Sequence, residues 1–323
     1  MIFLYEQGEQ GIRISRVFGI GESVEIPEKI QGYPVTELGA YAFSDRMDRK
    51  EFEGILASGK LCRDDGIPAD SVEGIPEMAG DVLQEVCLPE HLAKIGRYAF
   101  YNCRNLRKIR VGSELSDLGA GALTGCHRIE RVEAKLREDG SSCLRELLTE
   151  LPEELRVDLR KNGETGRFWF PEFFEEGVEN TPARILENHV HGSGIRYRNC
   201  FSHKSLNIKE YDKLFAYARA WEQESAVARL AADRVLYPME LSESAKEQYV
   251  NFLKEHILPA VSYLAQKKEY SAMGKILEEI LPGREDLDEM LVWSEREGDM
   301  ECVSLLMDHL HRHTKMRRKV FEL

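Results

Sequence analysis

The hydrophobic and polar positions of residues 83–132 repeat every 23 residues. Two apolar positions show the repeat most simply, namely Leu83, Leu106 and Ile129 at the first and Val86, Ile109 and Val132 at the second. The alternation of apolar and polar residues around the second position predicts short strands with one face turned inward. A period of this length is typical of a solenoid in which each repeat forms one coil.

The rest of the repeat is a glycine, an apolar pair and a cysteine. Ile95-Gly96, Ala99-Phe100 and Cys103 return as Leu118-Gly119, Ala122-Leu123 and Cys126. We expect the glycine to permit a tight turn and the apolar pair to pack onto the coil beneath. An earlier, longer copy runs from Ile26 to Phe43, with Arg46 at the cysteine position. The recurring residues should be buried, and positions that vary between copies, such as Arg107/Glu130 and Arg110/Glu133, should face solvent.

The pattern LxxVxLPxxLxxIGxxAFxxCxxL, found at residues 83–132, resembles the BspA-like class of bacterial leucine-rich repeats. The resemblance covers about the first 130 residues. It implies a curved β-solenoid that binds other macromolecules and has no catalytic residues. Known members of the class are often surface proteins with many repeats. This chain differs, because it has three recognisable units and its N-terminus, MIFLYEQGEQ, lacks the features of an export signal.

The segments that flank the repeat are less regular. Residues 46–82 read as an insertion with a short helix near Arg49–Ser58. A helix ending at Thr149 and a closing hairpin at about 151–170 follow the repeat, and Asn162-Gly163 suits the hairpin turn. We therefore assign residues 1–178 to a leucine-rich repeat solenoid that includes this insertion and closing hairpin.

The pattern changes to a helical period after Thr181. Predicted helices lie at Tyr211–Trp221, Ser225–Leu236, Ser244–Gln266, Tyr270–Ile280, Asp286–Glu297 and Met300–Lys315. Leu264 matches Trp293, Met273 matches Cys302 and Leu277 matches Leu306, each at an interval of 29 residues. This predicts a linker at 179–204 and an all-α domain of stacked helical hairpins, ankyrin-like or α-solenoid, at 205–323. The expected fold class is α+β.

Composition narrows the class of partner. The formal net charge of −13 argues against non-specific nucleic-acid binding, because a phosphate backbone attracts positive surface. No apolar stretch approaches the ~18 residues that a membrane span requires. Seven scattered cysteines and no export signal favour reduced thiols and a cytoplasmic location.

Two groups of residues could carry redox or metal chemistry. Cys103 and Cys126 lie one repeat apart, so adjacent coils would hold them about 5 Å apart. That spacing is compatible with a disulfide, but buried free thiols are the favoured interpretation. The candidate metal ligands are His189, His191, Cys200 and His203. Their spacing is not that of a structural zinc site, and a flexible linker around Gly192-Ser193-Gly194 is favoured instead.

The remaining candidate site residues lie near the end of the helical domain and near the end of the solenoid. His309 and His313 share one helix face, a geometry that can hold zinc. No third ligand occurs at the sequence spacing of a known zinc motif. A basic cluster comprises Arg312, Lys315, Arg317, Arg318 and Lys319. It suits a helix C-terminus better than a contact with nucleic acid or an acidic partner. An aromatic cluster, for which core or capping use is favoured over a binding platform, comprises Trp169, Phe170, Phe173 and Phe174.

No G-x-S-x-G, H-E-x-x-H or Cys/His catalytic signature occurs in the chain. We therefore expect a protein-protein interaction module or scaffold that is not an enzyme, needs no cofactor and binds a protein partner. The expected binding surface comprises Arg107, Lys108, Arg110, Glu130, Arg131 and Glu133. The alternative is a helical domain that senses a ligand or metal, or acts as an enzyme, through the His/Arg-rich segment 187–205.

Overall fold

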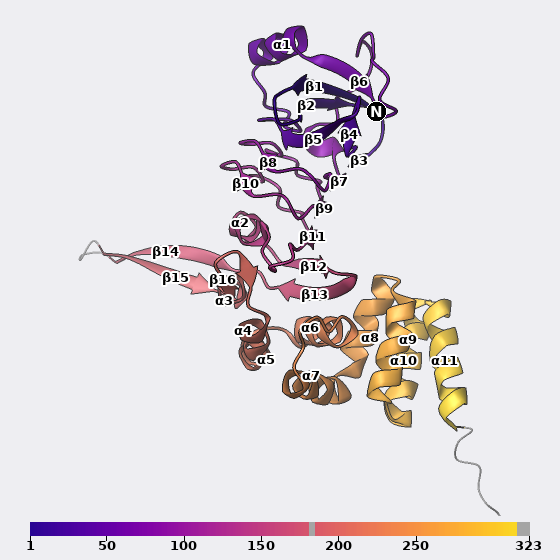
Figure 1. Cartoon of the computed structure of the whole chain (residues 1–323). Helices are drawn as coiled ribbons and strands as arrows, with labels where there is room; N and C mark the ends of the chain where they lie inside the picture. Colours follow the sequence, from indigo (N-terminus) through magenta and orange to yellow (C-terminus); the bar gives the residue numbers. More distant parts are fainter. Residues whose placement is uncertain (181–184, 315–323) are drawn as a thin grey trace, which may run out of the picture. The chain divides into compact units, whose positions relative to one another are not determined.

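The computed structural model describes residues 1–180 and 185–314, and it describes the side chains of all of these except 178–189 and 314. The chain forms two compact units (Figure 1). The first contains residues 1–165 and 170–207. The second contains residues 166–169 and 208–323. The α+β fold class predicted from the sequence is confirmed.

Two sheets build the first unit. The first has the order β10-β8-β5-β2-β1-β6, with strands Asp117–Leu118, Lys94–Ile95, Tyr33–Leu38, Ile12–Phe18, Ile2–Gln7 and Lys60–Arg63, and β4 (Lys29–Ile30) pairs with β5. The second has the order β13-β12-β11-β9-β7-β3, with strands Glu164–Phe170, Leu155–Lys161, Arg131–Lys135, Lys108–Val111, Glu85–Cys87 and Ser23–Glu25. Successive coils contribute one strand to each sheet, as in the pairs β7/β8 and β9/β10.

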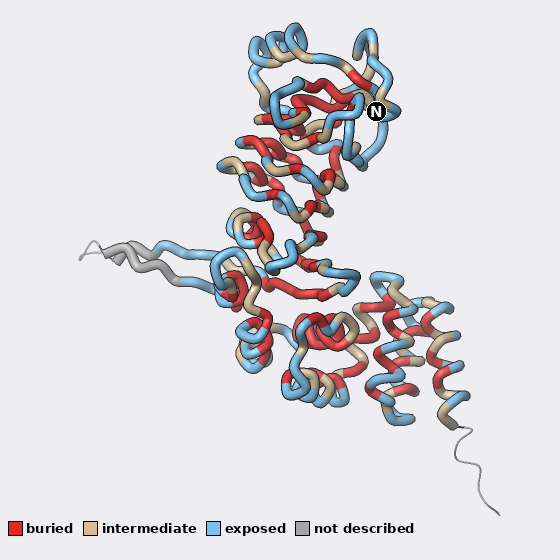
Figure 2. The backbone as a smooth tube through the Cα atoms, in the orientation of Figure 1, coloured by how far each residue is buried: buried red, intermediate tan, exposed pale blue. Residues whose placement is uncertain are grey.

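The parallel register of the second sheet equals the sequence repeat at its centre. Val86 pairs with Ile109, and Ile109 pairs with Val132. All three side chains are buried, and Figure 2 shows buried residues, in red, in each of the successive coils. The alternation of inward and outward positions predicted from the sequence is therefore present.

The repeating glycine is required for a reason that differs from our expectation. A Cβ atom on Gly119 would lie 2.4 Å from the backbone N of Arg97, and one on Gly96 would lie 2.5 Å from the N of Ala40. Neither glycine has a positive φ angle. The glycines are needed because successive coil backbones touch at this point. The expected tight turn does begin at each glycine, since Ala99 N–H donates to the Gly96 carbonyl at 3.3 Å and Ala122 N–H donates to the Gly119 carbonyl at 3.1 Å.

The left-handed backbone occurs two residues further along each coil. Tyr41, Tyr98 and Gly121 occupy one repeat position and have φ angles of 56°, 54° and 64°. The Tyr41 and Tyr98 rings stack with their centroids 5.5 Å apart, and the Phe43 and Phe100 rings stack at 5.2 Å. Equivalent side chains thus contact one another from coil to coil.

The segment predicted as an insertion is partly integral to the first sheet. Its helix α1 (Arg49–Ser58) has no buried residue and begins after the N-cap Asp48. The following strand β6 pairs antiparallel with β1 and contributes Cys62 to the core. A short 3-10 helix, η1 (Gly80–Val82), then returns the chain to the coil, where Gly80 N–H donates to the Phe43 carbonyl at 2.7 Å.

Residues 133–165 and 170–207 close the first unit. Helix α2 (Leu144–Thr149) precedes the β12–β13 hairpin, whose turn residues Asn162 and Gly163 have positive φ as the sequence predicted. β14 (Phe174–Asn180) pairs with β15 (Ile185–His191), and α3 (Gly194–Arg198), β16 (Phe201–Ser202) and β17 (Ser205–Leu206) follow. The range 179–204 that we expected to be a linker therefore contains regular structure.

A buried arginine fixes this closing segment. The Arg198 guanidinium is buried and donates hydrogen bonds to the carbonyl oxygens of Leu151, Glu153 and Pro171. Five N–H donors on one planar group allow it to satisfy several carbonyl groups that would otherwise be buried without partners. This explains why residues 194–200 pack as part of the first unit.

Helices form the second unit. They are α4 (Ile208–Lys213), α5 (Phe215–Trp221), α6 (Glu224–Leu236), α7 (Glu243–Glu255), α8 (Ile257–Gln266), α9 (Tyr270–Ile280), α10 (Arg284–Glu297) and α11 (Met300–Thr314). The single helix predicted at Ser244–Gln266 is two helices that meet at His256. Pro259 is the third residue of α8, where a backbone N–H has no partner within the helix, so proline marks a helix start here.

The interval of 29 residues corresponds to contacts between neighbouring helix pairs. α8 contacts α9 and α10, and α9 contacts α11. Cys302 Sγ lies 3.7 Å from Met273 Sδ, and Tyr270 Oη donates to Asp299 Oδ1 at 3.0 Å. Residues one interval apart are therefore spatial neighbours. The finer resemblance to ankyrin repeats stays a prediction.

Gly119→Ala tests whether touching backbones fix the stacking of the coils. The added methyl group meets backbone atoms, which cannot rotate away, so we expect a loss of about 1–3 kcal/mol in the free energy of unfolding. Gly54→Ala is the matched control, because a Cβ atom there meets nothing within 4 Å in α1 and alanine favours a helix by roughly 0.5–1 kcal/mol. Urea denaturation followed by circular dichroism measures both. An unchanged unfolding midpoint for Gly119→Ala would contradict the close contact.

Candidate protein-interaction surface

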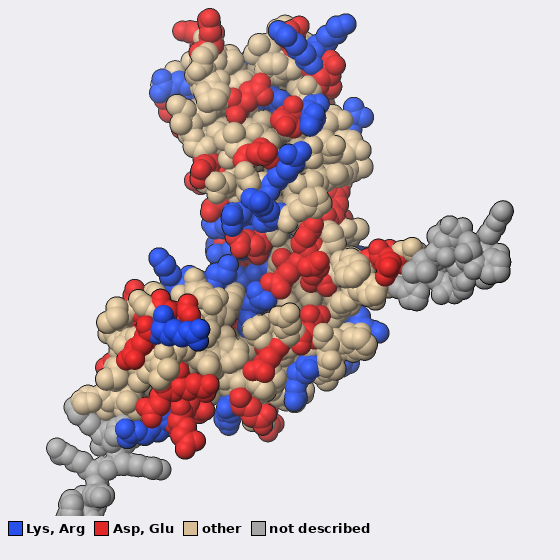
Figure 3. Space-filling model, turned by 180° about the vertical axis from the view of Figure 1, so that it is seen from behind, with Lys and Arg blue, Asp and Glu red and all other residues tan. Residues whose placement is uncertain are grey.

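Parallel stacking places equivalent outward side chains of the second sheet in rows. One row contains Glu25, Cys87, Arg110, Glu133 and Asp158. The row beside it contains Ser23, Glu85, Lys108, Arg131 and Arg156. We define the charged sheet face as Lys108, Arg110, Arg131, Glu133, Arg156, Asp158 and Arg160, which lie on β9, β11 and β12. Figure 3 shows Lys and Arg side chains gathered over these strands.

Glu133 lies at the centre of the charged sheet face and is buried beneath cations. Its side chain is 3% exposed, although we expected this position to face solvent. Four nitrogen atoms contact its carboxylate: Lys108 Nζ at 3.0 Å, Arg110 Nε at 2.9 Å, Arg131 Nη2 at 3.1 Å and Arg160 Nη2 at 3.3 Å. The expectation was wrong because the position points outward but the long side chains of its neighbours cover it.

The surrounding cations change the acidity of this carboxyl group. Burial by itself would raise the pKa of Glu133, because it disfavours the charged form. Hydrogen bonds from Lys108 and Arg110 and the charge of Arg131 outweigh burial and lower the pKa to about 2. Glu133 is therefore a fixed anion at neutral pH, around which the cations are held.

Asp158 is the second buried carboxylate of the charged sheet face. It is 2% exposed, and Arg131 donates to its Oδ2 from Nε at 2.9 Å and also from Nη2. Arg156 Nε lies 3.9 Å from Oδ1. Five cations thus surround two carboxylates, which leaves a positive excess. Arg110 and Arg160 remain 43% and 54% exposed, so part of that excess faces solvent.

The sheet becomes acidic beyond this face. Strands β3 and β7 present Glu25 and Glu85, both exposed. They line a hollow of about 420 Å³ that Lys108 and Arg110 also line. The outer surface of the sheet therefore changes from negative over β3 and β7 to positive over β9, β11 and β12.

The predicted surface residues divide into two sets. Lys108, Arg110, Arg131 and Glu133 come together in the charged sheet face. Arg107 and Glu130 instead pair with each other at 3.4 Å before strands β9 and β11. The sequence analysis missed Arg156, Asp158 and Arg160, because β12 follows β11 at a register of 25 residues and so falls outside the 23-residue repeat. The alternation in RVDLR was the available signal.

Three of the four candidate metal ligands of segment 187–205 have described side chains, and these three are not assembled into a site. His191 Nε2 pairs with Glu176 Oε2 at 3.0 Å, and its ring stacks on Phe174. Cys200 is buried, and its thiol donates to the Arg196 carbonyl at 3.4 Å. His203 occupies a turn with a φ angle of 56°. The side chain of His189 lies outside the described residues. Where side chains are described, none of the other three belongs to a group of three or more potential metal ligands.

Cys103 and Cys126 are buried free thiols. Cys103 Sγ donates to the Phe43 carbonyl at 3.3 Å, and Cys126 Sγ donates to the Phe100 carbonyl at 3.1 Å. The neighbouring Cys126 thiol, together with burial, raises the pKa of Cys103 well above its usual value. A buried thiol that remains protonated is a packing residue and not a nucleophile.

The other sequence candidates have mixed outcomes. Trp169 and Phe170 are buried, as core use predicts, whereas Phe174 is 55% exposed. In the C-terminal basic cluster, Arg312 pairs with Glu278 and Asp308. Lys315, Arg317, Arg318 and Lys319 lie outside the described residues.

Two features define a leucine-rich repeat unit here. The stacked coils share a repeating apolar core, and their outward side chains align in rows on the second sheet. The family described as "BspA type Leucine rich repeat region (6 copies)" matches residues 79–150, so the resemblance predicted from the sequence is confirmed for this part of the chain. The matched residues include β9 and β11, and with them Glu133 and its partners Lys108, Arg110 and Arg131. They exclude the helical unit. Repeats of this family indicate a protein-interaction module.

Two solved structures are similar to the chain. A leucine-rich cell surface protein from Faecalibacterium prausnitzii is 18% identical, with a TM-score of 0.23, over 42% of this chain and 35% of that chain. A leucine-rich repeat protein from T. pallidum is 22% identical, with a TM-score of 0.19, over 41% of this chain and 68% of that chain. The match thus spans about a third of the F. prausnitzii chain. No curated protein matches. Among the described residues, no helix has the length and apolar character needed to cross a membrane.

Glu133→Gln tests the buried anion through its pH dependence. Because the folded pKa of about 2 lies below the usual value of 4.5, ionised Glu133 stabilises the fold above pH 4.5, and this contribution disappears as the pH falls toward 2. We expect wild type to unfold with a larger free energy than Glu133→Gln at pH 7, and the difference to narrow between pH 4.5 and 2. Urea denaturation across this range measures it. A difference that stays constant with pH would contradict the assignment.

Proposed function

We propose that this chain is a non-catalytic protein-interaction module and that its charged sheet face binds an acidic segment of a protein partner. The observation that supports this most strongly is the pair of buried carboxylates, Glu133 and Asp158, which hold five cations in place. The cations are thereby arranged before any partner binds. Arg110 and Arg160 keep exposed guanidinium groups for carboxylates of that partner.

Preorganisation favours binding at such a surface. A free arginine loses side-chain entropy when it is immobilised against a partner, at a cost of roughly 0.5–1.5 kcal/mol for a flexible side chain. Arg110 and Arg131 are already held by hydrogen bonds to Glu133 and Asp158. A guanidinium has five donors, so holding one carboxylate leaves others for a second.

The distribution of charge favours an acidic protein segment over nucleic acid. The positive excess is confined to three strands, and the neighbouring strands present Glu25 and Glu85. A continuous phosphate backbone would extend onto this acidic flank and be repelled there. A protein segment can instead present carboxylates to the charged sheet face and basic residues to the flank, which matches the two signs across the sheet.

Charge reversal at the exposed arginines tests the proposal. The probe is a fluorescein-labelled peptide of alternating Glu and Gly, with a Lys and Gly peptide for comparison, and binding is measured by fluorescence anisotropy with the full chain. We expect the Glu peptide to bind more tightly, and Arg110→Glu or Arg160→Glu to weaken its binding about tenfold. Raising the salt concentration should also weaken it.

Lys29→Glu is the matched control, because Lys29 is an exposed cation of the same unit on β4, which pairs in the other sheet. It should bind the Glu peptide like wild type. Equal weakening by all three substitutions would show a general charge effect, and unchanged binding by the two arginine variants would show that the acidic segment binds elsewhere. Either result would reject this surface.

A further inference from the structure

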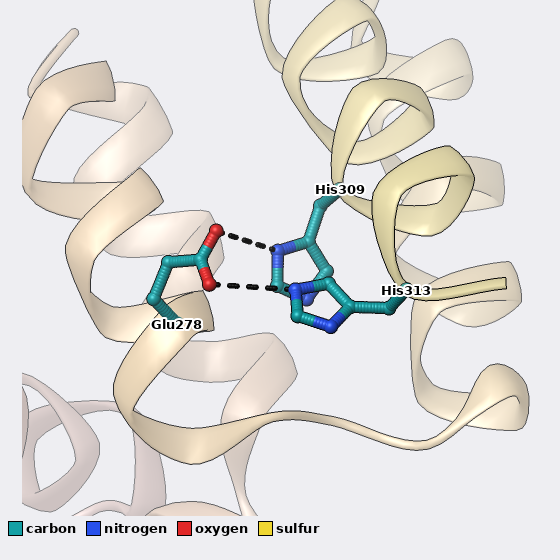
Figure 4. Close-up of side chains that lie close together, drawn as sticks. All are labelled: Glu278, His309 and His313. Atoms are coloured by element: carbon teal, nitrogen blue, oxygen red, sulfur yellow. Dashed lines mark ion pairs between the residues drawn. The ribbon is translucent and has the colours of Figure 1, made fainter. Parts of the chain in front are cut away.

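Helices α9 and α11 bring together three side chains that the sequence separates. Glu278 lies on α9, and His309 and His313 lie one turn apart on α11 (Figure 4). The sequence suggested the two histidines as a possible zinc pair but offered no third ligand. The packing of α11 against α9 supplies a carboxylate.

The spacing of these groups fits a small divalent cation. His309 Nδ1 lies 3.7 Å from Glu278 Oε1, and His313 Nε2 lies 3.3 Å from Glu278 Oε2. One ligand atom from each residue can be chosen so that all lie within 4.8 Å of one another. Zinc bonds of about 2.0–2.2 Å in a tetrahedron place ligand atoms roughly 3.3–3.6 Å apart. Small side-chain rotations would therefore complete the geometry.

His309 is the buried member of the group. Its side chain is 2% exposed. A neutral imidazole keeps a lone pair on one ring nitrogen, which is the donor that a metal requires.

We propose that Glu278, His309 and His313 form a binding site for Zn²⁺ or a similar divalent transition metal. Two imidazole nitrogens and a carboxylate oxygen are donors that suit zinc, and a fourth position would remain open to water. The ion would link α9 to α11 and so join the last two helix pairs of the chain. This site uses none of the residues of segment 187–205.

Arg312 is a competitor built into the same site. Its Nη1 donates to Glu278 Oε1 at 2.7 Å, and its Nε pairs with Asp308 Oδ2 at 3.0 Å. A bound cation would share the Glu278 carboxylate with this guanidinium or displace it, and Asp308 could retain the displaced arginine. The positive charge of Arg312 should therefore weaken metal binding, and its removal should strengthen it.

The test measures zinc affinity of the full chain after treatment with EDTA, by competition with a chromophoric chelator. Wild type should bind one Zn²⁺, and added zinc should raise its melting temperature. Glu278→Gln and His313→Gln each remove one ligand, and we expect the affinity to fall at least tenfold to a hundredfold. Arg312→Gln should bind zinc more tightly than wild type. Because His313 is 37% exposed, its replacement leaves the core intact, which circular dichroism verifies.

His311→Gln is the matched control, since His311 is exposed on the same helix and does not belong to the group. It should keep wild-type affinity and the rise in melting temperature. The absorption spectrum of the Co²⁺ complex, which distinguishes nitrogen and oxygen ligands from thiolates, should lack a sulfur charge-transfer band. The proposal is overturned if wild type binds no zinc, if Glu278→Gln and His313→Gln bind as tightly as wild type, or if the Co²⁺ spectrum shows thiolate ligation.

Discussion

Direct contact between the backbones of successive coils is the constraint on which the first unit depends. At Gly96 and Gly119 the preceding coil approaches so closely that a side chain has no room. This contact fixes the vertical spacing of the coils, and the parallel register then equals the 23-residue repeat in β7, β9 and β11. Aromatic stacking follows, because each ring lies against its equivalent in the coil before. The cysteine thiols of one coil likewise reach the phenylalanine carbonyl of the preceding coil.

The same register creates the charged sheet face. Lys108, Arg131 and Arg156 occupy one row, where like charges one strand apart repel. The adjoining row offsets this repulsion, because Arg110 is followed by Glu133 and Asp158. The buried carboxylates are thus structural, since they allow cations to accumulate on an acidic protein. The character of this surface thus comes from the outward residues that vary between repeats, while the repeated core residues supply the scaffold.

The recurring core could be predicted from the sequence because equivalent positions of successive coils are apolar and buried, as Val86, Ile109 and Val132 are. Features that break the period could not. The burial of Glu133 depends on the reach of four neighbouring side chains, and the place of β6 in the first sheet depends on pairing with β1, more than fifty residues earlier. Glu278 was missed because a ligand from another helix has no fixed spacing from His309 and His313. In contrast, Pro259 did mark the start of α8 and was overlooked.

A double-mutant cycle between Arg110 and Glu133 tests the central claim most directly. The two residues are 23 positions apart in sequence and contact each other only through the stacking of β9 on β11, with Arg110 Nε 2.9 Å from Glu133 Oε2. Free energies of unfolding for wild type, Arg110→Ala, Glu133→Gln and the double variant give their coupling. The stacked register predicts a coupling energy of about 1–2 kcal/mol. Additive effects, within roughly 0.3 kcal/mol, would contradict it.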